Sequence, residues 1–212
     1  MAVDVRTIVI TGGPCGGKTT ALELLRKELE GRGWQLVFVP ECATALISAG
    51  VAPWTCESRL EFQRRVFQLQ LAQERVFRDA ASAIPAEKVL LVCDRGLLDG
   101  KGYLQSGEFD IFLKEAGLSY DDIHARYDAV YHLMTAAKGA LEYYTLTNNA
   151  TRREPPEEAA KLDGKIVAAW KDHPQLCVID NSTGFELKLA RLVHEVLARL
   201  NEDGWDAGLE VL

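Results

Sequence analysis

Four glycines and a lysine lie close together near the start of the chain. The spacing G-x-x-x-x-G-K-[ST] is matched by Gly12, Gly13, Pro14, Cys15, Gly16, Gly17, Lys18 and Thr19, with Thr20 directly after. Glycines let a backbone bend closely enough for its N–H groups to face an anion, and a helix that follows adds the positive end of its dipole. In this arrangement Lys18 would reach the β- and γ-phosphates of a nucleoside triphosphate, and Thr19 would bind Mg²⁺.

The surroundings of this stretch support phosphate binding. It follows an apolar strand predicted at 5–11 and precedes a helix predicted at 17 to about 31. The alternative is a glycine-rich turn with a surface lysine, which the strand and helix on either side disfavour. We therefore predict that residues 12–20 form a P-loop that binds ATP or GTP, and the sequence does not decide between the two bases.

A charged pair follows a buried strand further along the chain. Asp94 and Arg95 lie at the carboxyl end of a strand predicted at 88–94. In an open α/β sheet this edge faces the ligand crevice. Asp94 could hold Mg²⁺ or its water there, and Arg95 could bind phosphate oxygens. The alternative is a turn that carries a surface ion pair.

Glu41 follows the second predicted strand, at 34–40. A carboxylate at the crevice could take the proton of an attacking hydroxyl, which is the acid–base task of phosphoryl transfer. Glu41 could equally be an acid in the first turn of a short helix. Both interpretations stay open.

Three further residues are candidates for contacts with a nucleotide. Arg152 and Arg153 lie in a polar loop before a predicted helix, where a lid could close cationic groups over the transferring phosphoryl group. An exposed, solvated face is the alternative for this pair. Asn181 follows the fifth predicted strand and is expected to contact the base, from its place in the layout alone.

The order of elements predicts the fold. Apolar runs at 5–11, 34–40, 88–94, 128–134 and 176–180 alternate with helical patterns. Such alternation implies right-handed crossovers and a parallel sheet covered by helices on both faces. We expect an α/β P-loop fold of three layers with a five-stranded parallel sheet, forming a single domain over 1–212 with a lid at about 138–165.

Two helices allow a prediction of which side is buried. In the long helix predicted from 59 to about 83, one stripe holds Phe62, Val66, Leu69, Gln73 and Val76. Gln63, Gln70 and Glu74 recur at helical spacing with Phe67 and Phe77, which we interpret as a half-buried shoulder of the helix rather than a surface that recognises a base. In the last helix, Thr183 and Glu186 are expected to form a capping box.

Composition limits the functional class. The chain has 212 residues with 48% hydrophobic residues, as ordinary globular proteins do. Its net charge of −7 offers no overall basic field for a nucleic-acid backbone, so no nucleic-acid partner is expected. The N-terminal apolar run is too short for a signal peptide, and no apolar run approaches the length of a membrane span. We expect a cytoplasmic protein.

Other motifs narrow the class of nucleotide-binding protein. The N-K-x-D motif of regulatory GTPases is absent from the sequence, and D-x-x-G at 99–102 is too short a pattern to weigh. Ring-forming ATPases need a longer chain with a lid domain. A small P-loop kinase fits the residues best.

The residues resemble a known family. The stretches ITGGPCGGKTT, VPECAT, CDRGLLDG and YTLTNNATRREPPEEAAKLDGKIVAAW are similar to the AAA-type P-loop domain shared by two proteins. These are the ribosylnicotinamide kinase part of bacterial NadR and the nucleotide-binding domain of the eukaryotic translocation-defect trafficking protein. The resemblance runs from about residue 6 to residue 198.

The resemblance to this family implies an enzymatic activity and roles for particular residues. Its kinase members use ATP or GTP with Mg²⁺ to phosphorylate a nucleoside 5′-hydroxyl. By similarity to deoxynucleoside and thymidylate kinases, Glu41 would be the base, and Arg152 or Arg153 a lid arginine. In the trafficking branch the domain binds GTP within a longer protein.

The sequence thus predicts a P-loop phosphotransferase or NTP hydrolase. The leading hypothesis is a kinase acting on an unidentified small hydroxyl-bearing acceptor. In it Lys18, Glu41, Asp94, Arg95, Arg152 and Arg153 are catalytic, and Thr19 and Asp94 hold Mg²⁺. The alternatives are a nucleotide-gated binding module with weak or no catalysis, which leaves a protein partner open, and a plain NTPase.

Overall fold

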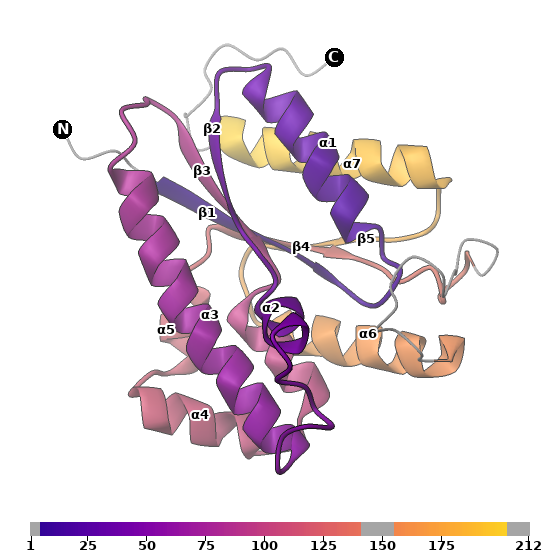
Figure 1. Cartoon of the computed structure of the whole chain (residues 1–212). Coiled ribbons are helices and arrows are strands. Elements are labelled where there is room, and N and C mark those ends of the chain that lie inside the picture. The colour runs from indigo at the N-terminus through magenta and orange to yellow at the C-terminus, as the bar shows by residue number, and fades with distance from the viewer. Residues whose placement is uncertain (1–4, 141–154, 203–212) are drawn as a thin grey trace.

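A computed structural model describes residues 5–140 and 155–202 of the chain. In these ranges it has one five-stranded sheet, in which every pair of neighbouring strands is parallel (Figure 1). The strands are β1 (Val5–Gly12), β2 (Gln35–Val39), β3 (Val89–Asp94), β4 (Ala129–Leu133) and β5 (Leu176–Ile179), and their order in the sheet is β2-β3-β1-β4-β5. The predicted α/β class and the five parallel strands are confirmed.

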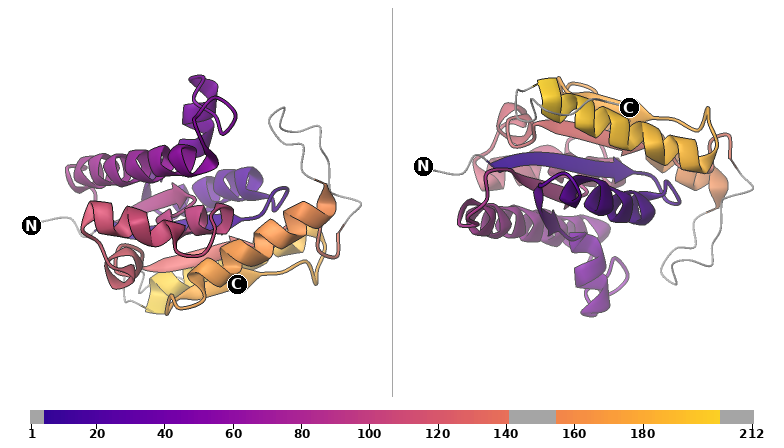
Figure 2. Two further views of the ribbon diagram at one scale, coloured as in Figure 1. Left: turned by 90° about the horizontal axis from the view of Figure 1, so that it is seen from below. Right: turned by 90° about the horizontal axis from the view of Figure 1, so that it is seen from above.

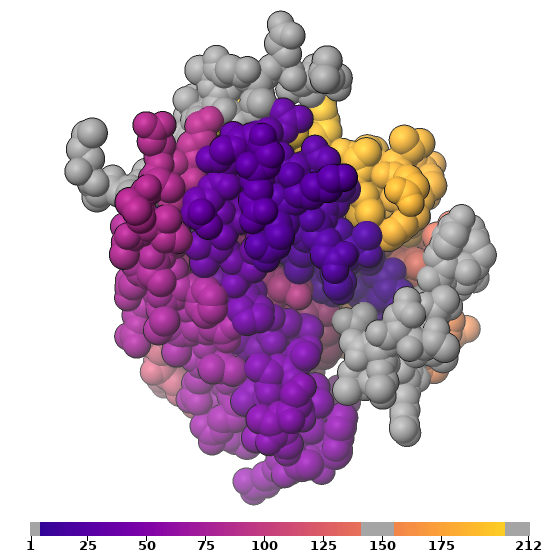
Figure 3. All heavy atoms as spheres, turned by 45° about the horizontal axis from the view of Figure 1, so that its top comes forward, coloured from indigo at the N-terminus to yellow at the C-terminus, as the bar shows by residue number. Residues whose placement is uncertain are grey.

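Helices cover both faces of the sheet. One face carries α1 (Lys18–Glu30) and α7 (Phe185–Glu202), which lie side by side in Figure 3. The other carries α3 (Arg59–Ser82), α4 (Glu108–Ala116), α5 (Tyr120–His124), α6 (Pro156–Trp170) and the 3₁₀ helix η1 (Leu97–Tyr103). The short α2 (Cys42–Ser48) follows β2 and stands out from these layers in both views of Figure 2.

The core consists of two apolar clusters, one on each face of the sheet. Strand β3 shows how they form, because alternate residues of a strand point to opposite faces. Val89, Leu91 and Cys93 pack toward α3 and α4, whereas Leu90 and Val92 pack toward α1 and α7. All five are fully buried, and burying one such aliphatic side chain contributes about 1.5–3 kcal/mol to stability. A central parallel strand therefore has to be apolar throughout.

The order of the strands places the ligand crevice. From β1 the chain crosses to the β2 side of the sheet, and from β3 it crosses to the β4 side. The loops after these two neighbouring strands thus leave in opposite directions, which opens a crevice at their carboxyl ends. The predicted P-loop follows β1, and Asp94 ends β3.

The prediction for α3 was wrong about the buried side. The helix begins after Ser58, whose side chain accepts a hydrogen bond from the N–H of Glu61, but its buried residues are Phe62, Gln63, Phe67, Gln70, Glu74 and Ala81. Val76, expected on the buried stripe, is 57% exposed. Burial of polar side chains here is allowed because they are satisfied: Glu74 accepts hydrogen bonds from Gln70 and Tyr127 and pairs with Arg126.

The start of α7 also differs from the prediction. The helix begins at Phe185, one residue later than a cap at Thr183 would place it. Within the described part of the chain, the Oγ1 atom of Thr183 is buried without a hydrogen-bond partner. The expected capping box is therefore absent.

Candidate functional site

The loop between β1 and α1 is shaped by glycines that no other residue could replace. Gly17 has φ 91° and caps α1, and Gly12 has φ 149°. A Cβ atom on Gly16 would lie 2.6 Å from the carbonyl oxygen of Leu133, and one on Gly12 would clash with the same oxygen. The loop is thus pressed against the end of β4, where only glycine fits.

The carbonyl groups of this loop are held from one side. Thr135 donates a hydrogen bond to the carbonyl of Pro14, the N–H of Ala136 donates to that of Cys15 (3.2 Å), and Lys188 Nζ donates to that of Gly16 (3.2 Å). In a trans peptide the N–H points opposite to the C=O, so the N–H groups that follow point away from these donors.

The loop therefore presents amide donors to a ligand. The N–H groups of Gly16 and Gly17 have no acceptor among the described residues. A row of such groups at the start of a helix is an anion-binding concavity. The geometry accordingly agrees with the phosphate binding predicted from the motif.

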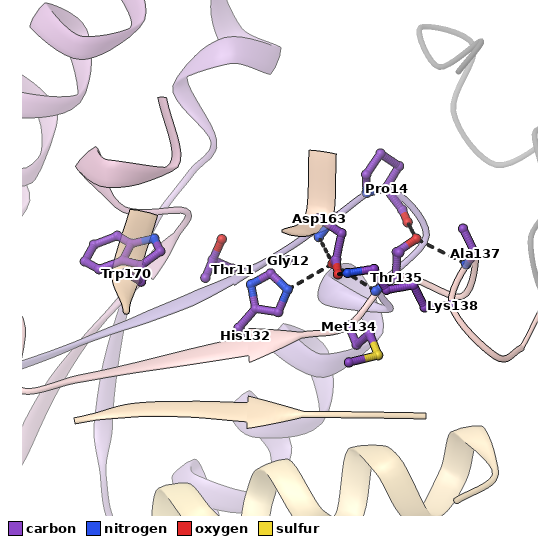
Figure 4. A network of polar contacts seen from close by, with 12 residues as sticks. Thr11, Gly12, Pro14, His132, Met134, Thr135, Ala137, Lys138, Asp163 and Trp170 are labelled. Carbon is purple, nitrogen blue, oxygen red and sulfur yellow. Dashed lines mark hydrogen bonds and ion pairs between the residues drawn. The ribbon is translucent and has the colours of Figure 1, made fainter. Parts of the chain in front are cut away.

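A buried carboxylate supports the loop from behind (Figure 4). Asp163 of α6 is fully buried and accepts hydrogen bonds from the backbone N–H of Gly13 (3.0 Å) and of Thr135 (3.0 Å). His132 Nε2 (2.9 Å) and Lys138 Nζ (2.8 Å) complete its partners. Burial alone would raise the pKa of Asp163, but the hydrogen bond and charge of His132 and the contacts with Lys138 and Thr135 outweigh it and lower the pKa well below its usual range.

In front of the loop lies a pocket of about 1190 Å³. This volume exceeds the usual range of small-molecule sites. It brings together groups that the sequence had placed on separate elements: the P-loop from Cys15 to Thr20, together with Glu41, Asp94, Asn181 and Lys188. Gly12, Gly13 and Pro14 lie outside this lining and shape the loop from behind.

Asp94 has the properties of a cation ligand. Its Oδ1 atom is buried and has no hydrogen-bond partner within the described ranges. Burial raises the pKa of Asp94, Lys18 lowers it and Glu41 raises it, with a net rise. An unpaired buried carboxylate oxygen is costly, and carboxylate and hydroxyl oxygens suit Mg²⁺. Because Thr19 lines the same pocket, these two residues fit the divalent cation predicted from the sequence.

Glu41 is held in a polar network at the N-cap of α2. Its carboxylate pairs with the Nε of Arg95 and accepts a hydrogen bond from Thr44 (2.7 Å). Burial would raise the pKa of Glu41, but the charges of Arg95 and Lys18 and the hydrogen bond from Thr44 lower it to about 2. Glu41 therefore carries a negative charge throughout the neutral range.

Arg95 faces protein groups rather than the pocket. Its backbone has φ 75°, a strained value for a residue with a side chain. Besides Glu41, its guanidinium contacts the carbonyl of Gly12 and Asp99, each through Nη1 at 3.2 Å. The predicted contact of Arg95 with phosphate stays a prediction, and its observed partners instead make it a support for Glu41 and the P-loop.

Asp99 connects Arg95 to the rest of the fold. It is buried and accepts hydrogen bonds from Thr11 (2.5 Å) and from the indole Nε1 of Trp170 (2.6 Å). Trp170 belongs to α6, so this helix contacts the site at two places, here and at Asp163. Asp99 was not predicted from the sequence, although the D-x-x-G pattern at 99–102 was a signal for it.

Asn181 is largely occupied by protein groups. Its Nδ2 donates to the carbonyls of Thr135 (2.8 Å) and Lys138 (2.7 Å), and its Oδ1 accepts a hydrogen bond from Lys188 (2.8 Å). An amide nitrogen has two hydrogens, so both donors are in use and one lone pair of Oδ1 is left. The expected contact with a base stays a prediction, limited to that lone pair. Arg152 and Arg153 lie outside the described residues.

Asp163 and Lys188 were also missed by the sequence analysis. Each lies on an otherwise apolar side of its helix: Asp163 falls four residues after Ala159 and three before Ile166, and Lys188 four residues before Leu192. A charged residue within a helix stripe that is otherwise buried is the signal that could have found them.

Comparison with known proteins agrees with this geometry. A family model described as an AAA domain matches residues 7–188. The chain belongs to this AAA domain family. The match covers the P-loop, Glu41, Asp94, Asp163 and Lys188 and identifies a P-loop nucleotide-binding domain. No curated protein matches the sequence of this AAA domain.

The fold of this AAA domain is also found in a solved kinase structure. Deoxyadenosine kinase from M. mycoides, solved with bound dATP, has a TM-score of 0.59 and 13% sequence identity over 91% of this chain and 99% of the kinase chain. At this identity the likeness concerns the fold. Among the described helices, none is both long and apolar enough to cross a membrane.

Proposed function

We propose that this AAA domain is a kinase that transfers the γ-phosphoryl group of ATP or GTP to the hydroxyl group of a small, nucleoside-like acceptor, with Mg²⁺. One observation carries the proposal: the P-loop amides and Lys18 share a single pocket with two carboxylates, Glu41 and Asp94. Phosphoryl transfer needs phosphate binding, a metal site and a group that orients the attacking hydroxyl.

Different residues are proposed to carry out these tasks. Lys18 and the amides of the P-loop bind the phosphates, and Thr19 and Asp94 would hold Mg²⁺, which when bound offsets negative charge on the phosphates. Arg152 and Arg153 are proposed to add positive charge at the transferring group. Arg95 positions Glu41 through the ion pair between them.

Glu41 is suited to orient a hydroxyl rather than to act as a strong base. With a pKa of about 2, its carboxylate accepts hydrogen bonds at neutral pH but holds a proton only weakly. The transition state of phosphoryl transfer is loose, and little negative charge has to be generated on the attacking oxygen beforehand. A permanently ionised acceptor of a hydrogen bond is sufficient for such a reaction.

Three further points support a nucleoside-like acceptor. The pocket exceeds the usual range of sites for one small molecule, so it has room beside a bound nucleotide. A structure with the same fold belongs to a kinase named for a deoxynucleoside. The resemblance to NadR adds nicotinamide riboside to the candidates.

A regulatory nucleotide-binding module is the second candidate, and one observation favours it. Both oxygens of Glu41 already have partners, Arg95 and Thr44. If these contacts persist with nucleotide bound, Glu41 holds the loop after β2 in place, and nucleotide binding would serve to change the conformation of that loop for a partner protein.

A coupled turnover assay tests the proposal. The purified chain is given Mg²⁺ and ATP or GTP, with and without a panel of nucleosides that includes nicotinamide riboside. Stimulation of turnover by one acceptor is expected. Tight nucleotide binding without acceptor-dependent turnover would contradict the kinase and favour the regulatory module, and turnover that ignores every acceptor would indicate a plain NTPase.

A further inference from the structure

Lys188 is a buried lysine that contacts the P-loop. Its residue is 3% exposed, and its Nζ donates hydrogen bonds to the carbonyls of Gly16 (3.2 Å) and Met134 (2.6 Å) and to Oδ1 of Asn181 (2.8 Å). These three acceptors are neutral, and no carboxylate of the described chain lies within ion-pair distance of this Nζ. A buried positive charge without a negative partner is costly, and a bound anion would offset this cost.

The contact with Gly16 acts on the group that would face a phosphate. The carbonyl of Gly16 and the N–H of Gly17 belong to one trans peptide and point in opposite directions. A charged donor on the carbonyl fixes the plane of this peptide and polarises it, which makes the N–H of Gly17 a stronger donor on the far side. Of the three donors that hold the loop carbonyls of residues 14–16, Lys188 is the charged one.

We propose that Lys188 is a second lysine of the phosphate site, a positioning residue that orients and polarises the Gly16–Gly17 peptide and whose charge is balanced by the bound phosphates. This rests on the proposed function to the extent that it needs a ligand carrying phosphates. Lys18, in contrast, lies within the motif itself and is expected to touch the phosphates directly.

The charges around Lys188 give the proposal a signature in pH. Burial lowers the pKa of Lys188, Asp163 of α6 raises it, Arg191 on α7 lowers it and Asp180 before α7 raises it, and the net value is about 8. The negative charge of a triphosphate bound by the loop favours the charged form of Lys188 and raises this pKa. Above pH 8, binding of phosphates should therefore take up a proton.

The first experiment compares Lys188→Met with Lys114→Met, a control at an exposed lysine in the last turn of α4. Affinities for ATP with Mg²⁺ and for inorganic tripolyphosphate are measured at pH 7. Because charge-assisted hydrogen bonds are strong, Lys188→Met should weaken the binding of both ligands about 10- to 100-fold. The control should leave the affinity for both unchanged. A loss for ATP alone would mean that Lys188 acts through Asn181 on the base, and would overturn the proposal.

A second measurement uses the wild-type chain and so does not depend on whether the variant folds. Calorimetry of ATP binding at pH 8.5 in two buffers of different ionisation enthalpy gives the number of protons taken up. The terminal phosphate titrates near pH 6, roughly as phosphate esters do, so uptake at this pH comes from the protein. Uptake is expected in wild type and reduced in Lys188→Met; no uptake in wild type, or equal uptake in both, would overturn the role of Lys188.

The results separate this inference from the proposed function. If wild type binds neither ATP nor tripolyphosphate, the proposed function fails and the role of Lys188 fails with it. If wild type binds both and Lys188→Met binds them equally well, only the role of Lys188 fails.

Discussion

Glu41 and Asp94 line the same pocket, yet their surroundings act on them in opposite ways. Arg95 and Lys18 overcome the effect of burial on Glu41 and hold its pKa at about 2. Around Asp94 burial prevails and the pKa rises, because only Lys18 and Arg95 favour its charge while Glu41 and Asp99 oppose it. One carboxylate thus has its cation within the protein, and the other is left for a bound metal ion.

Replacement of Glu41 tests the orienting role. Glu41→Gln should keep nucleotide affinity and lower acceptor-dependent turnover by about 10²–10⁴-fold, because the amide cannot replace the ionised acceptor. The matched control is Glu23→Gln, an acid of α1 in the lining of the same pocket. Kinetics of both variants give the comparison, and unchanged turnover in Glu41→Gln would remove this residue from the mechanism.

Replacement of Asp94 should separate stability from metal binding. Its folded-state pKa is raised, so the protonated form suits the fold, and the stability it contributes at low pH is lost as the pH rises through that pKa. Asn resembles the protonated form, so Asp94→Asn should melt at a higher temperature without ligand at pH 7. It should also lose the Mg²⁺ dependence of nucleotide binding.

Thermal melts without ligand check the expected rise in melting temperature, and nucleotide-binding titrations with and without Mg²⁺ check the loss of Mg²⁺ dependence. Asp79→Asn, at an exposed position of α3, is the control and should change neither property. Unaltered Mg²⁺ dependence in Asp94→Asn would place the metal elsewhere.

At the scale of elements, α6 connects the two halves of the site. Asp163 and Trp170 are seven residues apart, which is about two turns and places them on one side of the helix. Asp163 binds Gly13 of the P-loop, and Trp170 binds Asp99, which holds Arg95 and through it Glu41. The helix therefore sets the spacing between the loop after β1 and the loop after β3.

Removal of the charge at Asp163 should destabilise the fold in a way that depends on pH. Asp163→Asn removes the negative charge that accepts hydrogen bonds from buried His132 and from the N–H of Thr135, which costs about 1–3 kcal/mol in the free energy of unfolding at pH 7. Because the folded-state pKa of Asp163 is lowered, its contribution is present above the ordinary Asp value of 3.8 and is lost as the pH falls below it.

Melting curves between pH 3 and 7 measure this effect. The gap between wild type and Asp163→Asn should narrow below about pH 4, where the unfolded chain takes up the proton. Asp172→Asn, at an exposed residue just after α6, serves as the control. A gap that stays constant down to pH 3 would contradict the assignment of charge to Asp163.

The buried residues of elements that are apolar throughout could be predicted from the sequence. Where an element buries polar side chains, the buried side could not be predicted. The five strands were found because both of their faces are covered, which requires continuous apolar runs. In α3 the hydrophobic residues Val66, Leu69 and Val76 indicated the wrong side. Glu74 is buried there because Tyr127 and Arg126, about fifty residues away, satisfy it, and such partners cannot be seen within the helix itself.

At the scale of the whole molecule, the same distinction applies to the site. The P-loop was predicted because its chemistry depends on spacing within eight residues. Asp163 and Lys188 contact the loop across 150 and 172 residues of sequence, so only the folded sheet shows that they belong to it. That one domain spans 1–212, with a lid at about 138–165, stays a proposal, since 141–154 lie outside the described residues.

The pocket takes groups from most of the sheet, and a ligand should therefore stabilise the whole fold. It is lined by residues from β1–α1, β2–α2, β3, the segment after β4 and the start of α7. A ligand that binds only the folded state adds about 2.7 kcal/mol at a hundredfold excess over its Kd, or roughly 5–10 °C in Tm for a chain of this size. ATP or GTP with Mg²⁺ should produce such a shift.

Lys18→Ala supplies the decisive comparison for this shift. The variant removes the cation of the motif but leaves the sheet and both apolar clusters intact, so it should fold and lose most of the nucleotide-induced rise in Tm. Lys27→Ala, at an exposed lysine in the last turn of the same helix, should keep the full rise. An equal rise in wild type and Lys18→Ala would mean that the nucleotide binds away from the P-loop, because a ligand held by this loop cannot be indifferent to its lysine.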